Sequence, residues 1–483
     1  MENPAYNIIS NPGKPEGTKT GNNSGKKLFL ESYGCQMNFS DSEIVASILS
    51  DAGFTATGNV HESDVALLNT CSIRDHAEQR VRHRLDEFQS VKKRKPHLVI
   101  GILGCMAERL KTKLLEEEKI VDIIAGPDSY RQLPLLLKQV ESGRKAINTI
   151  LSAEETYADI TPVRINGNGV TAFISIMRGC DNMCSFCVVP FTRGRERSRN
   201  PETIVEEAKS LFDTGYREVT LLGQNVDSYL WHPLLGTKKE IIKEKANADA
   251  EDKADTVGFP DLLGLVATIN PLLRVRFSTS YPKDISDEVI NVMMKHENIC
   301  RHIHLPVQSG SDDVLMRMNR GYTRDWYLDR VKKIRSVIPG CAISTDIITG
   351  FCGETEDDQI MTLSLMDEVR FDFAYMFKYS ERPGTPAAKK YKDDVPDEIK
   401  TKRLQEVIAL QQKLSLESNR RAVGKIHKVL VEGKSKRSDK HLFGRNTQNA
   451  VVVFPEGTCK PGDYVNVIAD GCTAATLTGK VIG

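Results

Sequence analysis

The sequence predicts a multidomain α/β protein with an N-terminal doubly wound parallel sheet, a central open six-strand (β/α) barrel and a C-terminal small antiparallel β-barrel. Apolar strands alternate with amphipathic helices from residue 27 to about 140, and six further strand candidates separated by helices follow up to residue 379. After a long helical segment the hydrophobic period drops to two. At 483 residues the chain is also too long for one compact core, so several domains are expected.

Composition narrows the class of protein. Hydrophobic residues make up 40% and charged residues 27%, which is ordinary for a soluble globular protein and wrong for a membrane or disordered one. No apolar run approaches the ~20 residues of a membrane helix, so no membrane partner is expected. Residues 1–26 lack an apolar signal core and are rich in Gly, Asn, Lys and Pro, which predicts a disordered leader and a cytoplasmic location. The net charge of +1 means that any affinity for nucleic acid must come from local basic patches.

The N-terminal region, residues 27–150, repeats a strand, a cysteine and a helix. The strands KLFLESY, VALLNT and LVIGILG are followed at once by Cys35, Cys71 and Cys105. Because parallel strands end at one edge of a doubly wound sheet, these three cysteines, the first cysteine trio, are expected to converge and to share a metal cluster. Any one of them alone would more often be a buried structural thiol. A polar stretch over 151–169 reads as the linker to the next domain.

The central region, residues 170–395, contains the six barrel strands VTAFISIM, EVTLL, RVRFS, HIHLPV, AISTDII and DFAYMFKY. The active site of such a barrel lies at the carboxyl ends of its strands. The residues that follow the strands therefore become site candidates. The charged run within 231–258 is expected to be a solvated surface insertion.

A helix is predicted over 396–421, and short strands split by Gly, Pro and Asp turns fill 422–483. From Gly424 onward nine Lys or Arg stand against five Asp or Glu, a surplus that suits phosphate contacts, although a solvated barrel face would look similar. The candidate RNA contacts in this region are Lys434, Lys436, Arg437 and Arg445.

The strongest motif is RGCDNMCSFC, directly after the first barrel strand. Cys180, Cys184 and Cys187, the second cysteine trio, have Cys-x3-Cys-x2-Cys spacing. Cubane iron–sulfur clusters normally take four thiolates, so three leave one iron with an open coordination site. The alternative is a zinc site with a distant fourth ligand, but zinc sites favour paired Cys-x2-Cys units. The motif closely resembles that of the radical-SAM superfamily, in which S-adenosylmethionine chelates the open iron and is cleaved to a 5′-deoxyadenosyl radical.

Further residues resemble cofactor-contacting positions of that superfamily. Phe186 lies between two of the cysteines and is expected to pack over the cluster or the adenine, or else to be a plain core aromatic. The usual Gly-Gly-Glu after the second strand is replaced by LLGQNV, which leaves Gln224 and Asn225 as substitutes that bind the methionine amine. Gln308 in LPVQSGSD, and Asp346 and Gly350 in STDIITGFCGE, are weaker candidates because Gly-containing turns after strands are common.

The two trios and the terminal barrel together resemble the methylthiotransferases, which join an N-terminal methylthiotransferase domain, a radical-SAM domain and a C-terminal TRAM domain. YGCQMN, NTCSIR and CDNMCSFCVVPFTRGRERSR are similar to the MiaB group, which acts on isopentenyladenosine next to the anticodon. The resemblance implies two 4Fe-4S clusters and S-adenosylmethionine as cofactors. It also implies a transfer RNA anticodon stem-loop as substrate, a low-potential electron donor, a sulfur source and a monomer.

The mechanism implied by the resemblance uses two molecules of S-adenosylmethionine. One methylates a sulfur held at the first cysteine trio. The other is cut reductively at the second trio, and the radical takes the hydrogen from the adenine C2 carbon, to which the methylthio group transfers.

The basic run TRGRERSR follows the second trio. Its arginines are expected to grip anticodon-loop phosphates or to stack on splayed bases, since sequence-specific RNA recognition favours unpaired loops. A solvated or salt-bridged loop is the alternative. His302 and His304 alternate on the barrel-facing side and are interpreted as satisfied core histidines rather than as ligands. The arginines concerned are Arg193, Arg195, Arg197 and Arg199.

Two rival functions remain at this point. An electron carrier of the ferredoxin type would use the clusters only for redox chemistry, but two incomplete thiolate sets argue against it. A methylthiotransferase with another target, either threonylcarbamoyladenosine or a ribosomal protein, would keep the chemistry and change the substrate.

Overall fold

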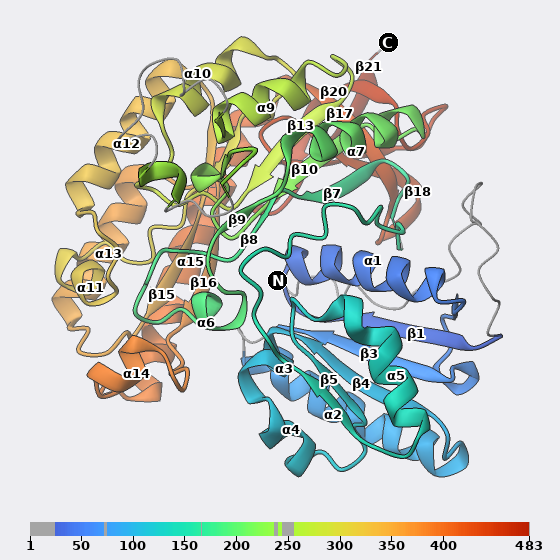
Figure 1. The fold of residues 1–483 in the computed structure, drawn as a ribbon. Coiled ribbons are helices and arrows are strands. Elements are labelled where there is room, and N and C mark those ends of the chain that lie inside the picture. Colours follow the sequence, from blue (N-terminus) through green and yellow to red (C-terminus); the bar gives the residue numbers. More distant parts are fainter. Residues whose placement is uncertain (1–24, 72–74, 166, 236–239, 244–255, 483) are drawn as a thin grey trace.

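The computed structural model describes residues 25–71, 75–165, 167–235, 240–243 and 256–482. Three bodies follow one another along the chain: a six-stranded sheet, an open barrel and a small closed barrel (Figure 1). The predicted α/β fold class is confirmed. The expected leader and most of the charged insertion lie outside the described residues. Within the described ranges no helix is both long and apolar enough to cross a membrane.

The N-terminal sheet is entirely parallel, with strand order β2-β1-β3-β4-β5-β6. Its strands are almost wholly buried because α1 and α5 cover one face and α2, α3 and α4 cover the other, each over its own apolar cluster. The elements are β1 (Lys27–Ser32), α1 (Gln36–Asp51), β2 (Thr55–Ala56), η1 (Val60–Glu62), β3 (Val65–Thr70), α2 (Asp75–Arg94), β4 (Val99–Gly104), α3 (Cys105–Leu110), α4 (Thr112–Glu117), β5 (Ile123–Ala125), η2 (Tyr130–Gln132), α5 (Leu133–Glu141) and β6 (Ala146–Asn148).

The central barrel consists of two three-stranded parallel sheets, β7-β10-β13 and β14-β15-β16. The backbone N–H of Cys300, just before β14, donates to the carbonyl of Val275 in β13 at 2.9 Å and joins the two sheets. All six predicted strands are present. The strands are β7 (Thr171–Ser175), β10 (Glu218–Leu222), β13 (Arg274–Ser278), β14 (His302–His304), β15 (Ala342–Thr349) and β16 (Phe373–Lys378).

Helices cover the outside of this barrel (Figure 1), and several begin where their sequence supplies a capping side chain. Ser286, Ser311 and Thr355 each accept a hydrogen bond from a backbone N–H of the first helical turn. The remaining elements are α6 (Val189–Thr192), α7 (Pro201–Asp213), η3 (Val226–Ser228), α9 (Phe259–Ala267), α10 (Asp287–Lys295), α11 (Asp312–Arg317), α12 (Arg324–Val337), α13 (Glu356–Val369), α14 (Pro386–Lys390) and the short ladders of β8 (Met177–Arg178) with β9 (Arg197–Ser198) and β11 (Leu230–Trp231) with β12 (Val257–Gly258).

The helix α15 (Asp397–Ala422) leads into the closed C-terminal barrel. All its strand pairs are antiparallel except β19 with β21, which is parallel. Arg274 and Arg276 of β13 donate to the main-chain carbonyls of Arg445 and Asn446 at 2.6 and 2.8 Å, so the small barrel is bound directly to the central one. Its strands are β17 (Ile426–Ser435), β18 (Ser438–Arg445), β19 (Val451–Pro455), β20 (Tyr464–Cys472) and β21 (Leu477–Ile482).

Candidate active site

The first cysteine trio lies where three neighbouring strands of the N-terminal sheet end. Cys35 is the N-cap of α1 after β1, Cys71 directly follows β3, and Cys105 is the first residue of α3 after β4. A hydrogen bond from the Cys71 thiol, aided by the charge of Arg193, lowers the pKa of Cys35 to about 6 in spite of its burial. Burial raises the pKa of Cys105, and the charge of Cys35 adds to that rise. The three thiols therefore gather at one edge of the sheet.

A glycine makes this approach possible. Gly34 has φ of +113°, and a Cβ atom on it would lie 2.1 Å from the Cβ of Cys71. Only a residue without a side chain lets the β1–α1 turn lie against the end of β3.

The second cysteine trio occupies the loop after β8 at the mouth of the barrel. The Cys187 N–H donates to the Cys184 carbonyl at 3.0 Å, and the Val189 N–H donates to the Cys187 sulfur at 3.5 Å. Burial, together with the charges of Cys184 and Cys105, raises the pKa of Cys187 to about 12. Cys105 belongs to the first trio, so the two trios are near enough to act on each other electrostatically.

The arginine run after this loop corrects the sequence-based expectation. Arg193, Arg197 and Arg199 are 2%, 2% and 6% exposed. They form ion pairs with Asp41, Asp128 and Glu207 respectively, so they are committed to buried carboxylates and do not face RNA phosphates. The salt-bridged alternative holds for these three. Arg195 alone is exposed, with 74% of its side chain accessible and Asp181 at 3.5 Å.

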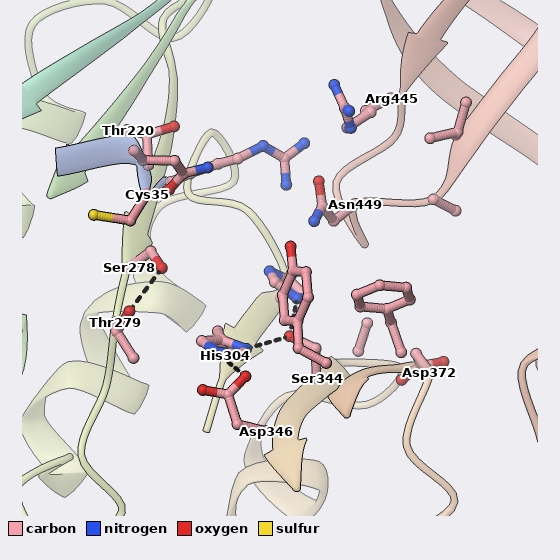
Figure 2. A pocket seen from close by; sticks show the side chains of 18 of the residues that line it. Cys35, Thr220, Ser278, Thr279, His304, Ser344, Asp346, Asp372, Arg445 and Asn449 are labelled. Atoms are coloured by element: carbon pink, nitrogen blue, oxygen red, sulfur yellow. Dashed lines mark hydrogen bonds and ion pairs between the residues drawn. The ribbon is translucent and has the colours of Figure 1, made fainter. Parts of the chain in front are cut away.

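A cavity of about 1820 Å³ lies between the N-terminal sheet, the central barrel and the small barrel. Thiols of both trios line it, namely Cys35, Cys71 and Cys187. Figure 2 shows Cys35 on one side of this cavity, Arg445 and Asn449 of the small barrel on another, and the inner strands of the central barrel between them.

Of the predicted cofactor contacts, Phe186, Gln308 and Asp346 line the cavity, whereas Gln224 and Asn225 are not among its lining residues. Three side-chain carbonyl oxygens near the strand ends are buried without a hydrogen-bond partner among the described residues: those of Gln224, Asn225 and Gln308. A buried acceptor without a donor is costly, and the amine and hydroxyl groups of S-adenosylmethionine are donors of the kind that these oxygens lack.

Gly350, the remaining predicted cofactor contact, does not line the cavity. It has φ of +70°, and a Cβ atom there would lie 2.3 Å from Cγ of Lys400 in α15. The glycine is needed for packing of the connecting helix against the end of β15.

The two barrel histidines line the cavity but are satisfied by hydrogen bonds, as expected. His302 Nε2 and His304 Nδ1 both lie 2.9 Å from Ser344 Oγ, and His304 Nε2 lies 3.4 Å from Asp346 (Figure 2). Burial, together with the charges of Arg276 and His304, lowers the pKa of His302 to about 3. His302 is therefore neutral at physiological pH.

The small barrel contributes basic groups to the cavity wall. Lys436 and Arg445 line it, while Lys434 and Arg437 are exposed outside the lining. Lys434 pairs with Glu456 at 3.6 Å, and Arg445 pairs with Glu432.

The donor set fits two cluster sites rather than a mononuclear metal. In the described part of the chain no three His, Cys, Asp or Glu residues are arranged to hold a single metal ion. None of the eleven cysteines, all of which lie within the described residues, forms a disulfide bond. Each thiolate of a cubane binds a different iron, so three thiols that face one space suit a cluster without having to meet at one ion.

Sequence reasoning missed three groups around the site. Arg320 Nη1 donates to the Cys184 sulfur at 3.2 Å, and no spacing pattern pointed to it. Phe373 and Tyr375 of β16 line the cavity with their ring centroids 4.8 Å apart. Their alternation in DFAYMFKY was the signal that could have placed both on the inner face of the barrel.

Three families match successive parts of the chain. The uncharacterized protein family UPF0004 matches residues 27–126, the radical SAM superfamily residues 174–366, and the TRAM domain residues 420–482. The first cysteine trio lies in the first match and the second trio in the next.

Curated relatives are similar over nearly their whole length. The tRNA-2-methylthio-N(6)-dimethylallyladenosine synthase of Amoebophilus asiaticus is 59% identical over 457 residues, covering 94% of this chain and 92% of the relative. The synthase of the same name from Bacteroides fragilis is 52% identical over 457 residues, covering 95% and 96%. The chain belongs to this synthase family. Membership of the family, with the radical SAM match, assigns 4Fe-4S clusters and S-adenosylmethionine as cofactors.

A solved structure outside the synthase family has the same fold. The radical S-adenosylmethionine methyltransferase TsrM from Kitasatospora setae superposes with a TM-score of 0.52 at 14% identity, covering 75% of this chain and 74% of that one. At this identity the likeness concerns the fold alone.

Proposed function

We propose that this protein converts N6-isopentenyladenosine next to the anticodon of transfer RNA to its 2-methylthio derivative. The observation that carries the proposal is the single cavity lined by thiols of both cysteine trios. The enzyme name shared by relatives that are 52–59% identical supports the same reaction and substrate.

The two cysteine trios have different roles at this cavity. Cys180, Cys184 and Cys187 hold one cluster with S-adenosylmethionine, and Cys35, Cys71 and Cys105 hold the other. When bound, these groups supply the 5′-deoxyadenosyl radical and the methylthio group. Phe186, Gln308 and Asp346 line the same cavity and are the contacts we propose for S-adenosylmethionine. The buried side-chain oxygens of Gln224 and Asn225 are the acceptors we propose for its methionine amine. The Nδ2 of Asn225 donates to Asp284 at 2.6 Å and fixes the orientation of that amide.

The size and wall chemistry of the cavity suit a nucleotide of an RNA loop. Its volume of about 1820 Å³ exceeds the ~300–1,000 Å³ of ordinary small-molecule pockets, which leaves room for a cofactor and a flipped base together. Phe373 and Tyr375 offer aromatic faces for an unpaired base. Around the small barrel, Lys434, Lys436, Arg437 and Arg445 are the proposed phosphate contacts, joined by the exposed Arg195 near the second trio.

The reaction needs partners besides transfer RNA. A low-potential electron donor must reduce the cluster of the second trio, and a sulfur source must replace the sulfur that each turnover transfers. We further propose that the enzyme acts as a monomer, since the cavity combines residues from all three bodies of one chain. Action on transfer RNA implies a cytoplasmic location.

The test is mass spectrometry of nucleosides after incubation of anaerobically reconstituted protein with dithionite, S-adenosylmethionine and transfer RNA that carries isopentenyladenosine. The expected result is 2-methylthio-isopentenyladenosine together with 5′-deoxyadenosine. A Cys184→Ala variant, treated identically, is the control and yields neither. Formation of 5′-deoxyadenosine without a thiolated nucleoside would redirect the proposal to threonylcarbamoyladenosine or a ribosomal protein. No 5′-deoxyadenosine at all would favour an electron carrier.

A further inference from the structure

Arg193 belongs to the loop of the second cysteine trio, but its side chain reaches the first. It follows α6, and its Nη2 donates to Asn38 Oδ1 and to Asp41 Oδ2 in α1, both at 2.8 Å. Its side chain is 3% exposed and that of Asp41 is 0% exposed. The guanidinium is therefore fixed inside the protein beside the helix that Cys35 caps.

Arg193 has a second terminal nitrogen, Nη1, on the other side of its guanidinium. Nη1 is buried without a hydrogen-bond partner among the described residues, and a buried N–H without an acceptor is costly. Asn38 Oδ1, which accepts from Arg193 Nη2, lies 3.7 Å from the sulfur of Cys35. Burial lowers the pKa of Arg193, but Asp41 and then the thiols of Cys105 and Cys35 outweigh this and raise it well above its ordinary value. The guanidinium therefore lies beside thiols of the first trio, whose sulfur atoms are acceptors of the kind that Nη1 lacks.

We propose that Arg193 is a positioning residue for the auxiliary cluster, meaning the cluster of Cys35, Cys71 and Cys105, and that its free N–H donates to sulfur there. This inference rests on the proposed function. A fixed cation and a hydrogen bond to sulfur stabilise the more negative, reduced state of a cluster, so Arg193 raises the reduction potential of the auxiliary cluster. The loop that holds the cluster of the second trio thereby supplies a hydrogen-bond donor to the auxiliary cluster.

Arg320 provides a matched reference at the second trio. Its Nη1 donates to the Cys184 sulfur at 3.2 Å, and its guanidinium lies 4.6 Å from the ring centroid of Tyr281. Like Arg193 it is buried, at 4% exposure. Each trio therefore has one arginine whose loss is expected to affect its own cluster.

The experiment is a redox titration of reconstituted holoenzyme followed by electron paramagnetic resonance, with the two cluster signals resolved by their response to S-adenosylmethionine. The variants are Arg193→Gln, Arg193→Lys and Arg320→Lys. Arg193→Lys keeps the positive charge that Asp41 requires but loses the forked donor, so it remains decisive even where Arg193→Gln fails to fold. We expect a lower midpoint potential and an altered signal of the auxiliary cluster in both Arg193 variants, and the corresponding shift of the other cluster in Arg320→Lys.

The inference is overturned if the auxiliary cluster of Arg193→Lys has the same midpoint potential as that of wild type. It is also overturned if the midpoint potentials of both clusters shift equally in that variant, because a general structural change would act on both. Wild-type protein with a single cluster signal overturns the proposed function and this inference with it. Two wild-type signals that stay fixed in the variants overturn this inference alone.

Discussion

Asp41 Oδ1 accepts a hydrogen bond of 2.8 Å from Nη1 of Arg178, and the two side chains are 0% and 1% exposed. The pair joins α1, which Cys35 caps, to β8, which immediately precedes the loop of Cys180. It therefore fixes the two cysteine trios relative to each other.

Removal of Arg178 should destabilise the protein. Arg178→Met leaves Asp41 buried with one cation fewer, and we expect a loss of about 3 kcal/mol, since uncompensated buried charge is costly. The measurement is the urea midpoint followed by circular dichroism. Lys332→Met is the control, because Lys332 pairs with Asp329 at the surface, where the two side chains are 68% and 79% exposed, and such pairs contribute less than about 1 kcal/mol. Equal midpoints for the two variants would contradict this account of the pair.

The same pair predicts a pH dependence. Burial by itself would raise the pKa of Asp41, yet Arg178 and Arg193 hold it below its ordinary value. A carboxyl group with a depressed folded-state pKa contributes stability that is complete above its unfolded pKa of about 3.9 and is lost as pH falls further. The urea midpoint of Asp41→Asn should therefore fall less steeply than that of wild type below about pH 4. Parallel curves would argue against the depressed pKa.

Gly34→Ala should remove one cluster selectively. The added Cβ meets Cys71, and the backbone at φ of +113° disfavours any side chain. We expect the iron content of reconstituted protein to fall by roughly half, with the S-adenosylmethionine-responsive signal retained. Gly143→Ala is the matched control, since Gly143 also has positive φ, +84°, but nothing lies within 4 Å of its Cβ position. Full iron content in Gly34→Ala would show that the turn can adapt.

Single cysteine substitutions should separate the two half-reactions. Cys184→Ala is expected to abolish cleavage of S-adenosylmethionine, whereas Cys71→Ala should keep cleavage and lose the methylthio product. Liquid chromatography of 5′-deoxyadenosine and of RNA nucleosides measures both. Cys459→Ala, a partly exposed thiol of the small barrel, should behave as wild type. Thiolated RNA from Cys71→Ala would remove the role given to the first trio.

Lys436 tests the RNA surface. Lys436→Ala should weaken transfer RNA binding and reduce by about one the slope of log affinity against log salt, because one phosphate contact is lost. Filter binding at several salt concentrations gives both numbers. Lys460 is also exposed on the small barrel but does not line the cavity, so Lys460→Ala is the comparison. Identical slopes for the two variants would place the RNA elsewhere.

Regular periodicity explains what could be predicted from the sequence. Apolar strands that alternate with helices allow few arrangements, so the parallel sheet, the six barrel strands and the closed terminal barrel were all predictable. The gathering of Cys35, Cys71 and Cys105 follows from the same rule, since each comes at the end of a parallel strand.

The arginine run shows what periodicity cannot supply. Arg193, Arg197 and Arg199 look like a basic surface because their carboxylate partners lie far away in the sequence or outside the motif. Burial of these cations is decided by tertiary pairing, which no local pattern encodes. The packing role of Gly350 was hidden for a similar reason, because the helix that requires a glycine there begins only at Asp397.

The attachment of the small barrel bears on how this protein can change over time. Arg274 and Arg276 bond to backbone oxygens at Arg445 and Asn446, not to side chains. Every amino acid has the same backbone carbonyl oxygen, so substitutions in this loop can alter the surface that faces a nucleic acid without removing these hydrogen bonds. RNA recognition can therefore change in evolution while the attachment of the small barrel is kept.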